Sequence, residues 1–190
     1  IRASKVTYDR KHSAFSEYDF NGFDIKNLLK DYTWLHLSGI TPALAKSCAA
    51  FVMDCLKTAK ELGLTVSFDG NFRSTLWSWD EARDFCTAVF LIDVLFGIEP
   101  YHLWNDENDH AKGDVKDGVP LQPSYEQQDE IFRRFVERFP NIKCIARHVR
   151  YAHSGSENSL KAFMWYDGHT FESKLFTFTI LDRVGGGDAF

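Results

Sequence analysis

The chain has 190 residues, of which 44% are hydrophobic and 26% charged, and its formal net charge is −5. This length and composition are typical of one globular domain with a sizeable core. The mild negative charge excludes a broad electrostatic attraction to nucleic acid or to an anionic membrane, so an anionic ligand would need a local cluster of Arg or Lys. No apolar run approaches the roughly 20 residues that cross a bilayer.

The chain reads as strands alternating with helices. The predicted strands span residues 5–8, 34–39, 64–68, 91–96, 142–146, 160–166 and 171–179. The predicted helices span residues 24–29, 41–62, 78–89 and 124–139. In the second helix Thr41 is the expected N-cap, Pro42 takes the first helical position, and Gly63 ends the helix.

This alternation predicts βαβ units and a parallel sheet. Asp167 and Gly168 predict a hairpin turn, and therefore an antiparallel edge on that sheet. The polar stretch 97–123 reads as a long loop or insertion. The cysteines form no C-x-x-C pair, which indicates reduced thiols and a cytoplasmic protein. They are Cys48, Cys55, Cys86 and Cys144.

Residues 182–190 read D-R-V-G-G-G-D-A-F. The consecutive glycines Gly185, Gly186 and Gly187 allow backbone N–H groups to converge on an anion. A helix starting at Asp188 would add its N-terminus to that cradle, and the Asp188 carboxylate could accept the proton of an attacking hydroxyl. Spacing alone equally allows an ordinary glycine turn with Asp188 as a helix cap. The pattern is neither a Walker A loop nor G-x-G-x-x-G.

The segment resembles the C-terminal signature of the ribokinase-like (phosphofructokinase B type) carbohydrate kinases, in which the glycine turn is the anion hole and the Asp is the base. Other segments resemble the 2-keto-3-deoxygluconate kinases of that family in order and spacing. They are residues 8–16, 36–44, 69–77 and 148–158. The resemblance implies an α/β fold with a central, mostly parallel sheet flanked by helices and a small β lid.

On this resemblance, residues 1–23 hold a lid portion and the return to the core, and residues 24–190 hold the central α/β domain. We expect sequence to be missing from both ends and residues 1–190 alone to be inactive. Kinases of this family commonly pair through the lid, so a homodimer is also expected.

The resemblance further implies ATP-dependent phosphorylation of a sugar-acid hydroxyl, with 2-keto-3-deoxygluconate as the expected substrate. Tyr8, Arg10 and Arg73 would hold this substrate, because Arg can bind a carboxylate through two hydrogen bonds. Arg150 and Ser154 would lie near the nucleotide, and Mg²⁺ would arrive with ATP.

One departure from the family pattern concerns the metal. The usual Asn-x-x-Glu motif is replaced by G-I-E-P-Y at residues 97–101. Either Glu99 or a residue of the insertion takes over the magnesium role, or metal handling is weakened. Two alternatives therefore stay open: a kinase of the same family for another sugar or keto-deoxy acid, and a non-catalytic sugar-acid sensor on the same fold.

Overall fold

The structure is a computed structural model that describes residues 9–10, 12–88, 91–98, 115–116, 119–120 and 122–181. Its centre is a seven-stranded sheet in the order β1-β2-β3-β6-β7-β8, with β9 also paired to β7. The strands are β1 Trp34–Ser38, β2 Thr65–Asp69, β3 Val94–Phe96, β6 Cys144–Ala152, β7 Glu157–Tyr166, β8 His169–Glu172 and β9 Phe176–Thr179. The helices are α1 Ile25–Leu29, α2 Ile40–Leu44, α3 Lys46–Glu61, α4 Trp79–Ala88 and α5 Tyr125–Arg138.

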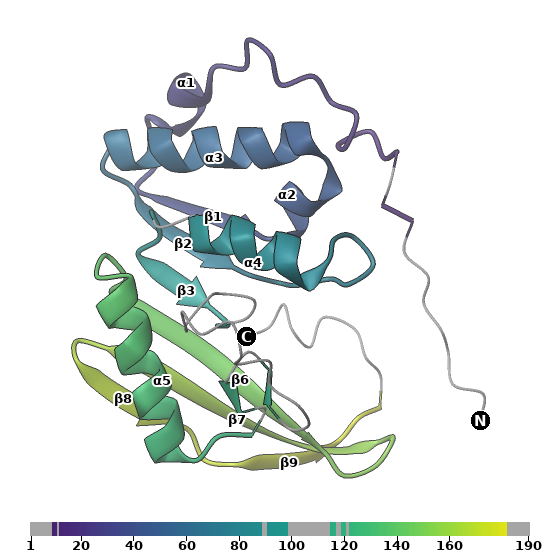
Figure 1. Cartoon of the computed structure of the whole chain (residues 1–190), viewed down its shortest axis with the longest axis vertical. Helices are drawn as coiled ribbons and strands as arrows, with labels where there is room; N and C mark the ends of the chain where they lie inside the picture. Colours follow the sequence, from purple (N-terminus) through teal and green to yellow (C-terminus); the bar gives the residue numbers. More distant parts are fainter. Residues whose placement is uncertain are drawn as a thin grey trace.

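The first half of the sheet is parallel. Strands β1, β2, β3 and β6 all run in the same direction, and the chain between them passes through α3, α4 and α5. In Figure 1 the strands β1 to β3 and the helices α2 to α4 make up the upper part of the molecule. Because parallel strands share a direction, their carboxyl ends lie at one edge of the sheet, where ligands of such sheets bind.

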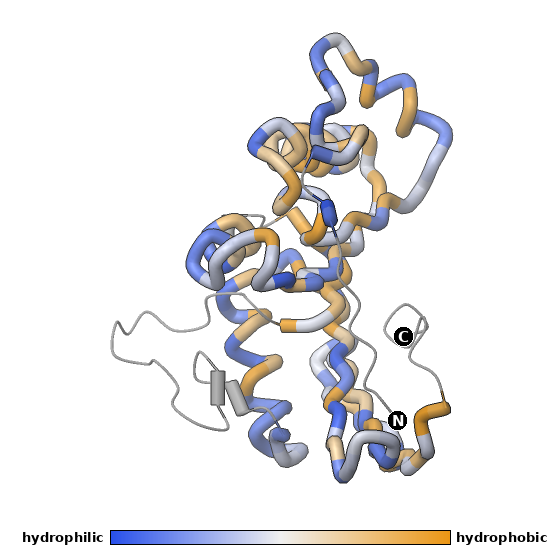
Figure 2. The backbone as a smooth tube through the Cα atoms, turned by 90° about the vertical axis from the view of Figure 1, so that its right-hand side faces the viewer, coloured by the Kyte–Doolittle hydropathy of each residue, from blue (hydrophilic) through white to orange (hydrophobic). Residues whose placement is uncertain are grey.

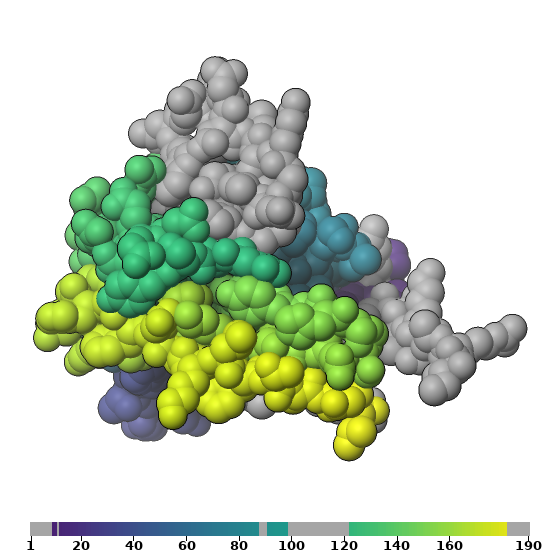
Figure 3. All heavy atoms as spheres, turned by 90° about the horizontal axis from the view of Figure 1, so that it is seen from below, coloured from purple at the N-terminus to yellow at the C-terminus, as the bar shows by residue number. Residues whose placement is uncertain are grey.

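The second half is antiparallel. Asp167 and Gly168 have φ angles of +50° and +78°, which suit the two-residue turn that joins β7 to β8. The predicted strand 171–179 is wrong as one element: it is divided into β8 and β9. Ser173 lies at the interruption, where its N–H donates to the Ala162 carbonyl and its Oγ accepts from the Ala162 N–H, both at 2.9 Å. Figure 3 shows β8 and β9, in yellow, at the surface of the molecule beside α5, in green.

The polar stretch 97–123 contains two short strands within its described part. These strands, β4 Val115–Lys116 and β5 Val119–Pro120, pair with each other as a separate antiparallel sheet. The predicted strand 5–8 lies outside the described residues.

One continuous core joins both halves of the sheet. Alternate residues of the central strands, such as Val66, Phe68 and Leu95, are fully buried. They belong to one cluster with buried residues of α3 and α5, including Leu56 and Phe132. Figure 2 shows hydrophilic and hydrophobic residues alternating along α5, as expected for a helix with one face on the sheet.

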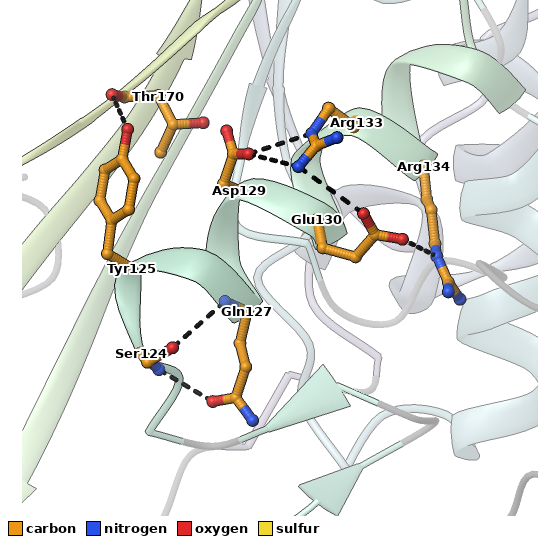
Figure 4. A network of polar contacts seen from close by, with 8 residues as sticks. All are labelled: Ser124, Tyr125, Gln127, Asp129, Glu130, Arg133, Arg134 and Thr170. Atoms are coloured by element: carbon orange, nitrogen blue, oxygen red, sulfur yellow. Dashed lines mark hydrogen bonds and ion pairs between the residues drawn. The ribbon is translucent and has the colours of Figure 1, made fainter.

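Helix α5 begins as the sequence predicts. Ser124 Oγ accepts from the Gln127 N–H at 3.2 Å, and Gln127 Oε1 accepts from the Ser124 N–H at 2.9 Å (Figure 4). This capping box satisfies two N–H groups that the helix cannot pair internally. The Tyr125 hydroxyl donates to the Thr170 carbonyl at 3.0 Å and so attaches the start of α5 to β8.

The predicted helix 41–62 is wrong as one element, because the chain is extended at Ala45 (φ −161°, ψ 160°) and separates α2 from α3. Gly39 rather than Thr41 is the N-cap of α2, and Pro42 is its third residue. Proline is tolerated there because the N–H groups of the first helical turn have no partner within the helix. Within the described residues, no helix combines the length and apolarity needed to cross a membrane.

Candidate active site

The carboxyl ends of β1 and β2 approach each other closely. The Gly39 N–H donates to the Asp69 carbonyl at 2.7 Å. A Cβ atom on Gly39 would lie 2.1 Å from the Gly70 carbonyl oxygen, so any side chain would force the two backbones apart. Glycine at position 39 therefore allows the two strand ends to meet without a side chain between them.

The chain turns immediately after β2. Asp69 Oδ1 accepts from the Asn71 N–H at 3.0 Å, and Asn71 has a φ of +39°. Asparagine tolerates this left-handed backbone better than most residues do. The Asn71 side-chain amide donates to Ser38 Oγ at 3.1 Å, which joins the turn after β2 to the end of β1.

Asp69 is a partly buried carboxyl group at this edge. Burial raises its pKa, although the Asn71 N–H and the neighbouring His36, Arg73 and His148 act in the opposite direction. These neighbours come from β1, from the loop after β2 and from β6, so the fold gathers ionisable groups that are far apart in the sequence. A carboxyl group with a raised pKa among such neighbours is typical of functional sites.

Arg73 follows Asn71 on the same loop and is exposed. Its Nη1 donates to the Phe72 carbonyl at 3.1 Å, which is a local contact within the loop. On the far side the loop is held by the Phe72 ring, which meets the Trp79 ring of α4 edge to face at 4.9 Å between centroids. The Arg73 side chain is therefore open to solvent at the carboxyl end of β2, and its role in binding a carboxylate stays a prediction.

Three further polar side chains, which the sequence analysis missed, lie on β1 and β2. The Trp34 indole N–H donates to Ser67 Oγ at 2.8 Å, and His36 Nδ1 lies 2.8 Å from the same oxygen. An indole N–H can only donate, so the Ser67 proton remains available to His36. The signal was present in the sequence: His36 and Ser38, like Ser67 and Asp69, are polar residues two apart in otherwise apolar strands, and thus share a sheet face.

The predicted nucleotide residues lie farther along the sheet. Ala146 of β6 is level with the end of β3, and Arg150 is four residues beyond it, roughly 13 Å along the strand. Ser154 Oγ accepts from the N–H groups of Ser156 and Glu157 at 3.3 and 2.9 Å, so it stabilises the β6–β7 turn. The role of Arg150 and Ser154 in nucleotide binding stays a prediction.

The other predicted residues divide into two groups. Arg10 is described and partly buried. Outside the described residues lie Tyr8, Glu99, Gly185, Gly186, Gly187 and Asp188. Ile98, which takes the position of Asn in the altered metal motif, is a core residue with 1% exposure. In the described part of the chain, no group of three His, Cys, Asp or Glu side chains could hold a metal ion.

All four cysteines are free thiols, as predicted. Burial, and secondarily the charge of Asp69, raises the pKa of the Cys86 thiol to about 12. Burial likewise raises the pKa of Cys55 to about 11. At neutral pH these groups are uncharged and therefore poor nucleophiles.

The parallel sheet, its helical crossovers and its antiparallel edge define an α/β protein with the fold of the ribokinase-like carbohydrate kinases. A PfkB family carbohydrate kinase from Listeria grayi matches it with a TM-score of 0.79 and 28% sequence identity, over 97% of this chain and 53% of that chain. The fold class and the family resemblance expected from the sequence are thus confirmed.

More particular relatives are sugar-acid kinases. The 2-dehydro-3-deoxygluconokinase from Thermotoga maritima matches with a TM-score of 0.81 and 32% identity, over 99% of this chain and 55% of that chain. The 2-dehydro-3-deoxygalactonokinase from Haloferax volcanii is 29% identical over 190 residues, which are 100% of this chain and 52% of the relative. The chain therefore spans about half the length of these two relatives. No family model matches the chain.

Proposed function

We propose that the natural full-length protein is a carbohydrate kinase that uses ATP to phosphorylate a hydroxyl of a sugar acid. The proposed substrate is 2-keto-3-deoxygluconate, also called 2-dehydro-3-deoxygluconate. The observation that carries the proposal is the exposed Arg73 at the carboxyl end of β2, in a chain similar along nearly its whole length to two kinases of 2-dehydro-3-deoxy sugar acids.

In this proposal the Arg73 guanidinium binds the carboxylate of the sugar acid. A guanidinium presents two parallel N–H groups that match a carboxylate, and such charged hydrogen bonds contribute about 1.5–3 kcal/mol each. Arg10 and Tyr8 would complete the substrate site.

The chemical step is assigned to the glycine segment. Asp188 would accept the hydroxyl proton, and the N–H groups of Gly185, Gly186 and Gly187 would stabilise the charge of the transferred phosphoryl group. ATP would bring Mg²⁺, which usually keeps several waters and binds to the substrate phosphates. Glu99 remains the proposed protein contact for the metal, and Arg150 and Ser154 the proposed contacts for the nucleotide.

The test is an ATP-consumption assay of the natural full-length protein with a panel of substrates. The panel comprises 2-keto-3-deoxygluconate, 2-keto-3-deoxygalactonate, gluconate, ribose and fructose. We expect turnover of at least one keto-deoxy acid and little with the neutral sugars. Preference for a neutral sugar would contradict the carboxylate argument.

Two variants separate the proposed roles. Asp188→Asn should lower kcat by about 10²–10⁴ while sparing sugar-acid binding, because Asn is nearly the same size but accepts no proton. Arg73→Ala should raise the KM for the sugar acid at least tenfold and leave the KM for ATP unchanged. Arg133→Ala is the matched control, since Arg133 is an exposed arginine paired with Asp129 on α5.

A sugar-acid sensor is the second candidate, and it is favoured by the buried apolar Ile98 at the Asn position of the altered metal motif. A sensor would bind the sugar acid in calorimetry without consuming ATP. We also propose that the protein forms a homodimer through the lid, which light scattering on the full-length protein would test.

A further inference from the structure

The hydrogen bond between Asn71 and Ser38 joins two strand ends just before Arg73. We propose that Asn71 and Ser38 are positioning residues for Arg73, and that their bond sets where the guanidinium meets the carboxylate of the substrate. This inference rests on the proposed function, because it assumes that Arg73 binds the sugar acid.

The entry to the Arg73 loop is fixed from both strands. The Asp69 carboxylate holds the Asn71 N–H at 3.0 Å, and the Asn71 side chain then reaches across to Ser38 Oγ at 3.1 Å. Ser38 Oγ also accepts from the Ile40 N–H at 3.4 Å, so the start of α2 helps to orient it. Gly39 and Gly70 have no side chains, so the Asn71 amide can reach across this junction to Ser38.

The loop has a second set of contacts, within itself and to α4. The N–H of Leu76 donates to the Arg73 carbonyl at 3.0 Å, and the Phe72 ring contacts the Trp79 ring of α4. Arg73 thus follows two anchored residues, Asn71 at the strand ends and Phe72 against α4. Losing the Asn71–Ser38 bond would release the first residue and leave the second in place.

The bond lies at the periphery rather than in the core. It is partly buried, and neither Asn71 nor Ser38 belongs to the hydrophobic cluster that holds the sheet and helices together. Local contacts of this kind open more easily than the core does. Loss of the Asn71–Ser38 bond should therefore displace the loop while changing the free energy of unfolding little. A displacement of about 1 Å is enough to weaken a positioned contact strongly.

The test measures sugar-acid KM, ATP KM and kcat in the natural full-length protein. Asn71→Gly removes the amide but keeps a residue that adopts positive φ readily. Ser38→Ala removes the acceptor, whereas Ser38→Thr keeps a hydroxyl. We expect Asn71→Gly and Ser38→Ala each to raise the sugar-acid KM about tenfold, with kcat and ATP KM within about twofold of wild type, and Ser38→Thr to restore the wild-type KM.

Asn141→Gly is the matched control. The Asn141 amide donates to the Ile92 carbonyl at 2.5 Å, close to the start of β3 and thus at the opposite edge of the sheet. This variant also loses a side-chain amide bond to the fold, and its sugar-acid KM should stay at the wild-type value.

The double variant Asn71→Gly with Arg73→Ala distinguishes positioning from direct binding. If Asn71 acts through Arg73, the double variant should have the same sugar-acid KM as Arg73→Ala alone. An unchanged KM in Asn71→Gly and Ser38→Ala, beside a raised KM in Arg73→Ala, would overturn the positioning role and leave the proposed function intact. Equal changes in both KM values and kcat would overturn it in favour of general destabilisation. An unchanged KM in Arg73→Ala would overturn both proposals.

Discussion

Two aspartates at opposite edges of the sheet have different hydrogen-bond partners and opposite pKa shifts. Asp93 lies just before β3 at the amino edge and is 3% exposed. Its carboxylate lies 2.7 Å from Lys60 Nζ and 3.1 Å from Lys143 Nζ, and it accepts from the Val66 N–H at 2.9 Å. Burial alone would raise the pKa of Asp93, but these contacts outweigh it and hold the pKa below its usual value.

Asp69, at the carboxyl edge, has one N–H donor, from Asn71, among the described residues. There burial prevails and the pKa is raised. The amino edge therefore uses the Asp93 carboxylate to join α3, β2 and the residue before β6, whereas the carboxyl edge leaves the Asp69 carboxylate incompletely compensated. Incomplete compensation costs stability and leaves hydrogen-bonding capacity for a ligand, which fits a binding edge.

The largest effect should come from Asp93→Ala. Its removal leaves the Val66 N–H and two lysines without their partner, and we expect a loss of about 3 kcal/mol in the free energy of unfolding. Denaturant unfolding of the full-length protein at pH 7 measures it. Asp69→Ala should cost clearly less, and an equal loss for the two would remove the contrast between the edges.

Gly39→Ala should have the next largest effect. The new Cβ would meet the Gly70 carbonyl oxygen at 2.1 Å, so β1 and β2 must separate at their carboxyl ends, at a cost of about 2 kcal/mol. Gly155→Ala is the matched control, since no atom lies within 4 Å of a Cβ built there. The control should change unfolding by less than about 0.5 kcal/mol. Equal stability of the two variants would show that the strand ends have room.

The smallest effect concerns pH and has opposite signs for the two aspartates. The lowered pKa of Asp93 means that its contribution to stability is present above the unfolded pKa of about 3.9 and is lost as pH falls through the folded pKa. The raised pKa of Asp69 means that stability decreases as pH rises from about 3.9 through its folded pKa.

Stability curves from pH 3 to 8 test these signs. Asp93→Asn should be less stable than wild type at pH 7 and should approach it in acid. Asp69→Asn should match wild type in acid and equal or slightly exceed it, by less than about 1 kcal/mol, at pH 7. Parallel curves for both variants would contradict the assigned shifts.

Local signals predicted much of the fold. The helix start at Ser124, the stop at Gly63 and the turn at Asp167 each depend on residues close in sequence, so the sequence pattern alone predicts them. The break at Ala45 and the interruption at Ser173 carry no such signal. At Ser173 the deciding contacts are to Ala162, on another strand.

The site was predictable only in part. Arg73 could be proposed because it stands in a recognisable segment, and the structure places it at the expected edge. The partnership of Asn71 with Ser38, and the proximity of His148 to Asp69, depend on which strands become neighbours. Their sequence spacing carries no information about that order. The roles assigned to Asp188 and its glycines remain predictions.

The divided sheet also bears on how the chain folds. Short connections join β6 to β7, β7 to β8 and β8 to β9, and β8 and β9 both pair with β7, so this pairing closes only short loops. Strands β1, β2 and β3 pair only after a helix has been brought across between them, which closes longer loops and costs more chain entropy. We therefore expect the meander of β6 to β9 to form early and to offer the free edge of β6, on which the parallel strands then assemble in the order β3, β2 and β1.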